Sequence, residues 1–72
     1  MRENFVRLAE ARTNKALKML SVIGNLSNKS NYQYTKNDVD KIFNALETEL
    51  RRNRKRFETA LGEKKDKGFK LD

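Results

Sequence analysis

Residues 34–61 read YTKNDVDKIFNALETELRRNRKRFETAL, and this stretch decides the fold. Its apolar residues recur at spacings of three and four, so on a helix they form one stripe along one side. The stripe consists of Val39, Ile42, Phe43, Leu46, Leu50, Phe57, Ala60 and Leu61. Thr35 and Asp38 have the spacing of an N-terminal capping box, with Asp38 in place of the usual Glu. The pattern predicts an amphipathic helix over residues 36–61.

A similar apolar pattern precedes this stretch and predicts a first helix over residues 2–27. At about 100° per residue, its large apolar positions fall within one arc. They are Phe5, Leu8, Ala9, Ala16, Met19, Leu20, Ile23 and Leu26. Gly24 and Asn25 are a suitable place for the helix to end. The polar residues from Ser27 to Tyr34 favour turns and predict a loop.

Two helices of nearly equal length joined by a short loop are expected to run antiparallel. Residues whose numbers add to about 62 would then face each other, so that Phe5 meets Phe57 and Met19 meets Phe43. We therefore expect an all-α fold, an antiparallel two-helix hairpin. The hairpin domain covers residues 1–61, and residues 62–72 form a flexible, charged C-terminal tail.

The apolar surface is wider than one partner helix can cover. Val6 and Leu17 lie beside the apolar arc of the first helix. A single seam between two helices also gives a thin core for a domain of this size. We expect the hairpin to form a homodimer, with four helices in an antiparallel bundle.

Two polar residues interrupt the apolar stripes. Arg12 lies in the middle of the first arc, and Asn53 lies between Leu50 and Phe57. A buried Arg needs a partner, so Arg12 is expected to reach Glu49 or a backbone carbonyl. Asn53 is a candidate for fixing the register or the oligomer number, as single polar core residues do in coiled coils. The alternative is that both residues reach the rim of a narrow interface with their polar ends in water.

Composition excludes most catalytic chemistry. The chain has 72 residues and neither Cys nor His, so thiol chemistry, disulfides and a His general base are excluded. It has no glycine-rich phosphate loop, and its close carboxylate pairs are two residues apart, which makes them diverge on a helix. We expect a protein that is not an enzyme and that has no catalytic residues, no metal site and no cofactor.

No window of the sequence approaches the roughly 18 apolar residues that cross a membrane. We therefore expect a cytoplasmic protein without a membrane partner.

The net charge of +7 is distributed unevenly. A dense cationic block follows the acidic first half of the second helix. Its candidate nucleic-acid residues are Arg51, Arg52, Lys55 and Arg56, joined by Arg2 and Arg7 on the antiparallel neighbour. Such a surface attracts nucleic-acid backbone without reading sequence. The alternative is that the block is simply the solvated side of a helix.

Two other segments are candidates for binding a protein partner. Tyr32 and Tyr34 lie in the loop, where each is either an apolar plug with its hydroxyl in water or a stacking platform for a base. Phe69 and Leu71 alternate in the final segment, which could add as a strand to the sheet edge of another protein. The alternative for this segment is a frayed end or one that folds back onto the bundle.

Three runs of the chain carry a resemblance. They are LAEARTNKALKMLSVIGNLSN at 8–28, YQYTKNDVDKIFNALETEL at 32–50 and GFKL at 68–71. The chain resembles a family of small bacterial proteins of uncharacterised function that occur in chromosomes, plasmids and phages. The resemblance implies a bacterial cytosolic setting linked to mobile elements, and it supplies no activity, cofactor or catalytic residue. The basic run RRNRKR at 51–56 departs from the family pattern.

The resulting functional hypothesis is a small non-enzymatic interaction or adaptor protein, which binds a protein partner through the loop or the C-terminal segment. The alternative is binding of nucleic-acid backbone through the basic face at residues 51–56. The first hypothesis is favoured because surface runs of Arg and Lys more often serve solvation than binding.

Overall fold

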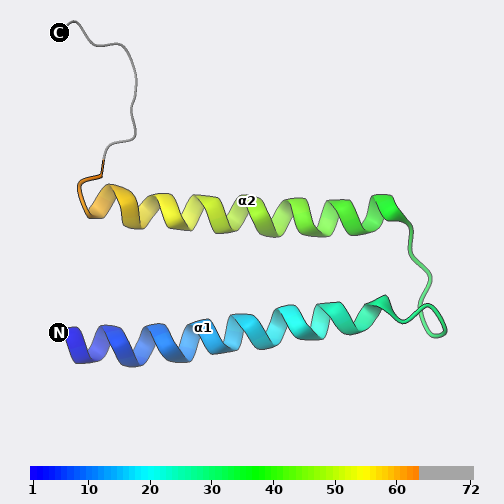
Figure 1. The fold of residues 1–72 in the computed structure, drawn as a ribbon, viewed down its shortest axis with the longest axis horizontal. Helices are drawn as coiled ribbons and strands as arrows, with labels where there is room; N and C mark the ends of the chain where they lie inside the picture. Colours follow the sequence, from blue (N-terminus) through cyan, green and yellow to red (C-terminus); the bar gives the residue numbers. More distant parts are fainter. Residues whose placement is uncertain (64–72) are drawn as a thin grey trace, which may run out of the picture. The chain divides into compact units, whose positions relative to one another are not determined.

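The chain is all-α in the part that the structure, a computed structural model, describes, which is residues 1–63 (Figure 1). The element order is α1 (Arg2–Gly24), the 3₁₀ helix η1 (Asn25–Ser27) and α2 (Lys36–Ala60). These residues contain no strand. They divide into two compact units, the first covering residues 1–34 and the second beginning at Thr35. The predicted all-α organisation of two long helices and a connecting loop is confirmed.

The first unit begins with α1, which starts directly after Met1. No side chain caps this end, but the backbone N–H of Phe5 donates to the Met1 carbonyl at 3.1 Å. Glu3 lies in the first turn, where a negative charge interacts favourably with the helix dipole. The start of α1 therefore agrees with the predicted helix.

The end of α1 differs from the prediction in its last three residues. The α-helix ends at Gly24, and Asn25–Ser27 form the tighter turn of η1 instead of continuing to residue 27. Gly24 has φ −60° and Asn25 has φ −65°, so the chain stays right-handed here. It leaves the helical region at Asn28, with ψ 102°. A 3₁₀ turn is a common way for an α-helix to end, and Gly24 does not act as a left-handed cap.

The second unit begins with the predicted capping box. Thr35 is extended, with φ −113° and ψ 167°, and its Oγ1 accepts from the backbone N–H of Asp38 at 3.1 Å. The Asp38 Oδ2 atom accepts from the backbone N–H of Thr35 at 2.9 Å. The two bonds satisfy donors that the first turn of a helix leaves open. Asp38 thus fulfils the role that Glu usually has.

The end of α2 is a Schellman motif that the sequence analysis missed. Gly62 has φ +83°, a value that favours glycine. Its N–H donates to the Thr59 carbonyl at 3.0 Å, and the N–H of Glu63 donates to the Glu58 carbonyl at 2.9 Å. The left-handed conformation of Gly62 therefore terminates α2, with Leu61 as the cap residue. The predicted tail at 62–72 lies, from residue 64 onward, outside the described residues.

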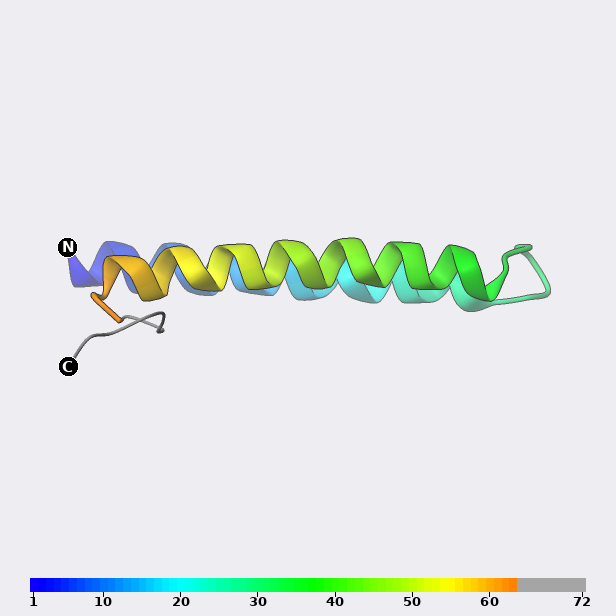
Figure 2. The ribbon, with the colours of Figure 1, turned by 90° about the horizontal axis from the view of Figure 1, so that it is seen from above.

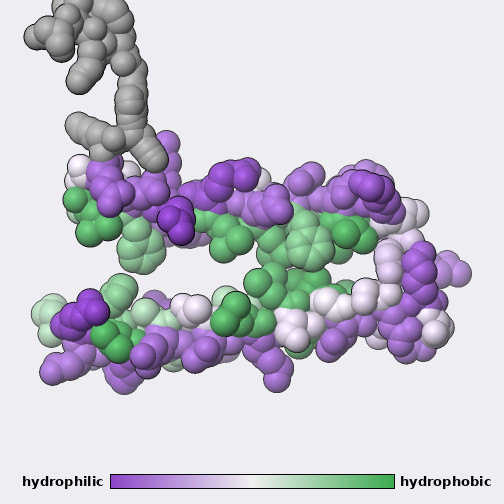
Figure 3. Space-filling model, in the orientation of Figure 1, coloured by the Kyte–Doolittle hydropathy of each residue, from purple (hydrophilic) through white to green (hydrophobic). Residues whose placement is uncertain are grey.

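Each helix is continuous in two perpendicular views (Figures 1 and 2). Along α2, apolar residues gather on one side and hydrophilic residues on the other (Figure 3). This segregation is the amphipathic pattern expected from the spacing of its apolar residues. The antiparallel register that pairs Phe5 with Phe57 stays a prediction.

We predict that Thr35→Ala lowers the free energy of unfolding by about 1 kcal/mol, because it removes the side-chain acceptor of the capping box. Urea denaturation followed by circular dichroism measures this loss. Thr48→Ala, at an exposed position within α2, is the matched control and should not lower stability, because Ala favours a helix interior more than Thr does. Equal effects of the two variants would show that the capping box does not stabilise α2.

Candidate interaction surfaces

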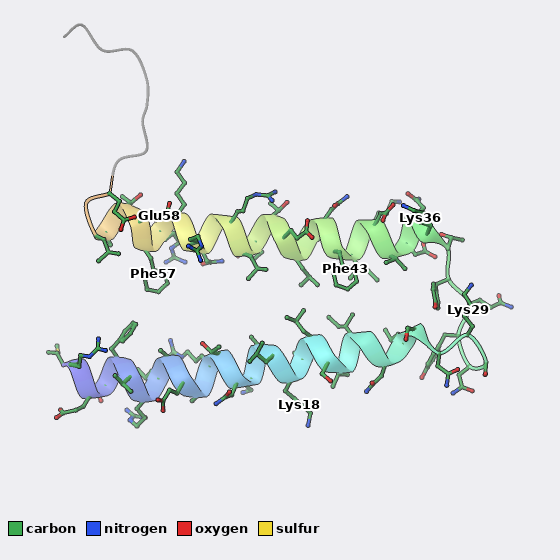
Figure 4. All side chains as sticks on the ribbon, in the orientation of Figure 1. Lys18, Lys29, Lys36, Phe43, Phe57 and Glu58 are labelled. Carbon is green, nitrogen blue, oxygen red and sulfur yellow. The ribbon has the colours of Figure 1, made fainter. Side chains whose placement is uncertain are left out.

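The apolar stripe of α2 is exposed along its whole length. None of its residues is buried among residues 1–63: Val39 and Leu46 are half-buried, and the exposed fraction is 65% at Leu50, 59% at Phe57 and 72% at Leu61. Phe43 and Phe57 project from the same side of the helix (Figure 4). A contiguous apolar strip of this kind is typical of a helix face that packs against another helix.

The apolar arc of α1 has no buried residue either, although Leu8, Ala9 and Ile23 are half-buried. Phe5 is 51% exposed and Met19 is 57% exposed. Leu17, which lies beside the arc, is 58% exposed. Arg12 is exposed in the middle of the arc and has no side-chain hydrogen bond or ion pair within residues 1–34. Its predicted contact with Glu49 stays a prediction.

Asn53 is held by its own helix. Its Nδ2 donates to the Glu49 carbonyl at 2.8 Å and to the Glu49 Oε2 atom at 2.9 Å, and its Oδ1 accepts from Arg56 Nη1 at 3.1 Å. Both amide protons are therefore used, and the residue is half-buried. The remaining hydrogen-bonding capacity of Asn53 towards another chain is therefore one lone pair on its Oδ1. The sequence analysis missed this clamp, although the i, i+4 spacing of Glu49 and Asn53 was a usable signal.

The cationic residues of α2 differ in how they are partnered. Arg52 Nη1 lies 3.2 Å from Glu49 Oε1, and Arg56 donates to Asn53. Arg51 and Lys55 have no side-chain hydrogen bond or ion pair within the described residues, and neither has Arg54. The four predicted residues Arg51, Arg52, Lys55 and Arg56 all lie on α2 and are exposed. We call these four residues the α2 ridge.

The two cations predicted to join this surface belong to the other unit. Arg7 Nη2 donates to Asn4 Oδ1 at 3.2 Å, one turn earlier on α1. Arg2 is exposed and forms no side-chain bond within residues 1–34. That Arg2 and Arg7 extend the α2 ridge stays a prediction.

The loop after η1 is ordered by Tyr34. The Tyr34 hydroxyl donates to the Ser27 carbonyl at 2.7 Å, and the Lys29 ammonium lies 4.7 Å from the centre of its ring (Figure 4). Asn28 supports the turn, because its Oδ1 accepts from the Ser30 N–H at 2.9 Å. The expectation that the Tyr34 hydroxyl lies in water stays a prediction, and the hydroxyl also donates to the backbone of its own loop. The Lys29 contact was also missed.

The other predicted contact residues divide into two groups. Tyr32 is 47% exposed, and its side chain has no hydrogen bond or ring contact within residues 1–34. Tyr32, and not Tyr34, is therefore the tyrosine that the loop leaves available. Phe69 and Leu71 lie outside the described residues.

Neither a metal centre nor a membrane span is found in the part of the chain that the structure covers. Residues 1–63 contain no group of three or more carboxylates that could hold a metal ion. Neither α1 nor α2 combines the length and the apolar character that crossing a bilayer demands.

Comparison with protein-family models, with curated proteins and with solved structures finds no match. The resemblance to small bacterial proteins therefore stays a prediction, and the function has to be argued from the surfaces themselves.

We predict that Tyr34→Phe destabilises the protein by about 1 kcal/mol, because the loop loses the hydrogen bond to Ser27. Tyr32→Phe is the matched control and should have no measurable effect, since its hydroxyl has no partner in the loop. Chemical denaturation of both variants measures the difference. If Tyr32→Phe is as destabilising as Tyr34→Phe, the loop is not held in this way.

Proposed function

We propose that this protein is a non-enzymatic interaction protein that uses two surfaces. The apolar stripe of α2, together with the apolar arc of α1, associates with a second copy of the chain. The loop at 28–33 presents Tyr32 to a protein partner. The observation that carries the proposal is that the two apolar surfaces are ordered into stripes and yet contain no buried residue among residues 1–63.

The stability of α2 depends on what covers its apolar stripe. The backbone of α2 satisfies its own hydrogen bonds, and its two ends are capped. A helix of 25 residues in water is nevertheless marginal without packing of its apolar face. Burying one Leu or Phe side chain contributes about 1.5–3 kcal/mol. Covering the stripe is therefore the main available source of stability, and an antiparallel four-helix bundle of two chains is the symmetric way to achieve it.

We predict that Leu50→Glu converts a dimer into a monomer and lowers its helical content, because it places a charge in the middle of the stripe. Light scattering after gel filtration at micromolar concentration should give the wild type twice the chain mass of 8.5 kDa. Thr48→Glu is the matched control, since Thr48 is exposed and lies off the stripe. It should remain dimeric. A wild type that elutes at the mass of one chain would contradict the dimer.

The loop is proposed as the protein-binding surface because it combines order with an available aromatic ring. Tyr34 and Asn28 fix the backbone of the loop, so little conformational entropy is lost when it binds. Tyr32 supplies a large amphipathic side chain of the kind that is enriched at interfaces. The terminal GFKL segment at 68–71 is the second proposed contact. A bacterial cytoplasmic setting is proposed on the resemblance alone.

We predict that Tyr32→Ala lowers the affinity for a captured protein partner at least tenfold, because aromatic anchors dominate interface energies. Affinity capture followed by titration of the isolated partner measures the change. Gln33→Ala, at the neighbouring exposed position, is the control and should bind as the wild type does. A variant lacking residues 68–72 tests the other contact. If the partner binds Tyr32→Ala unchanged and is lost only on the deletion, the loop is not the binding surface.

A further inference from the structure

The charge of α2 changes sign along its length. Residues 37–50 contain Lys41 against Asp38, Asp40, Glu47 and Glu49, which gives −3. Residues 51–56 contain four Arg and one Lys with no acid, which gives +5. These six residues occupy about 8 Å of helix, at 1.5 Å per residue. This density of charge requires a physical reason.

The helix dipole does not supply that reason. Cations stabilise the C-terminal end of a helix, but the effect is confined to the last turn. The last turn of α2 contains no basic residue. The cationic block therefore lies too far from the end of the helix to be explained by its dipole.

Pairing within the helix does not supply it either. Within the described residues, Arg52 has Glu49 as an ion-pair partner, while Arg51, Arg54 and Lys55 have none. Arg51 and Lys55 are four residues apart, as are Arg52 and Arg56, and like charges at this spacing destabilise a helix. An external anion would offset the repulsion within these two pairs.

The α2 ridge is separate from the apolar stripe. Lys55 lies about 200° around the helix from Phe57, and Arg51 and Arg52 lie on the same side as Lys55. The ridge therefore stays open to solvent when the stripe is covered by other helices. An anionic membrane would contact the apolar stripe and the cations together, whereas a nucleic acid contacts the cations alone.

From these observations we infer that the α2 ridge binds the phosphodiester backbone of nucleic acid without reading its sequence, with Arg51 and Lys55 as the principal contacts. Guanidinium and ammonium groups both bind phosphate, and Arg does so with two parallel hydrogen bonds. Residues 51–56 contain no aromatic residue on which a base could stack. The interaction is consequently electrostatic and depends strongly on salt.

The test uses the full chain and fluorescein-labelled 20-base-pair DNA duplexes of two unrelated sequences. Fluorescence polarisation should give equal affinities for the two sequences. Two phosphate contacts, those of Arg51 and Lys55, at about 0.9 counterions each, predict that Kd rises about 12-fold between 50 and 200 mM NaCl. A preference of more than tenfold for one sequence, or no binding at 50 mM NaCl, would overturn the inference.

Two double variants of equal charge locate the surface. Arg51→Gln with Lys55→Gln should weaken binding at least tenfold. It should also lower the slope of log Kd against log salt concentration by the share of about two phosphate contacts. Lys36→Gln with Lys41→Gln, in the acidic half of the same helix, should weaken it less than threefold. Neither change should lower helicity measurably, because the first removes a repulsion and the exposed Lys36–Asp40 ion pair lost in the second is weak. Equal losses in both variants would mean that net charge and not the ridge binds DNA.

Vesicles of phosphatidylserine and phosphatidylcholine distinguish the lipid alternative. Under the inference, vesicles do not displace the labelled duplex at 100 mM NaCl. A second measurement uses the Phe57→Trp variant, whose tryptophan fluorescence reports contact with lipid. Displacement of the duplex by vesicles, together with protection of this fluorescence from aqueous quenchers, would assign the ridge to a membrane surface instead.

Discussion

The need to remove the apolar stripes from water is the constraint on which the rest of the structure depends. The backbone hydrogen bonds of α2 need no partner, because the caps at Thr35 and Gly62 satisfy its two ends. The apolar side chains, in contrast, are not removed from water, since Leu50 and Phe57 remain more than half exposed. Helices of this length gain most of their stability from packing and not from intrinsic propensity. Under the proposed function, association with a second copy supplies this packing.

This constraint divides α2 into two sides with separate roles. On one side, the apolar stripe is suited to packing against other helices, because apolar packing depends on shape complementarity and not on charge. On the other side, Arg51 and Lys55 remain in solvent with no partner within the described residues. Asn53 lies within the apolar stripe and is tied to Glu49, which also pairs with Arg52. The clamp brings polar groups into the stripe and keeps them satisfied on the same helix, so that a covering helix need not supply their hydrogen bonds.

Local chemistry made much of this fold predictable from sequence, and the failures have physical reasons. The capping box of Thr35 and Asp38 was predictable because both partners lie within one turn. Gly62 was visible in the sequence, but its left-handed role depends on bonds from Glu63 and Gly62 to carbonyls of the last turn. The 3₁₀ turn at 25–27 was missed because α and 3₁₀ helices share an apolar pattern over so few residues. The bond from Tyr34 to Ser27 depends on the path of the loop, which no periodicity encodes.

The central claim is that helix formation in this protein depends on covering its apolar stripes with a second copy. Far-UV circular dichroism across a dilution series, with sedimentation at each concentration, tests that claim most directly. The account predicts that helical content falls as the dimer dissociates, and that both changes share one midpoint. Full helical content in a sample that sediments entirely as single chains would contradict it.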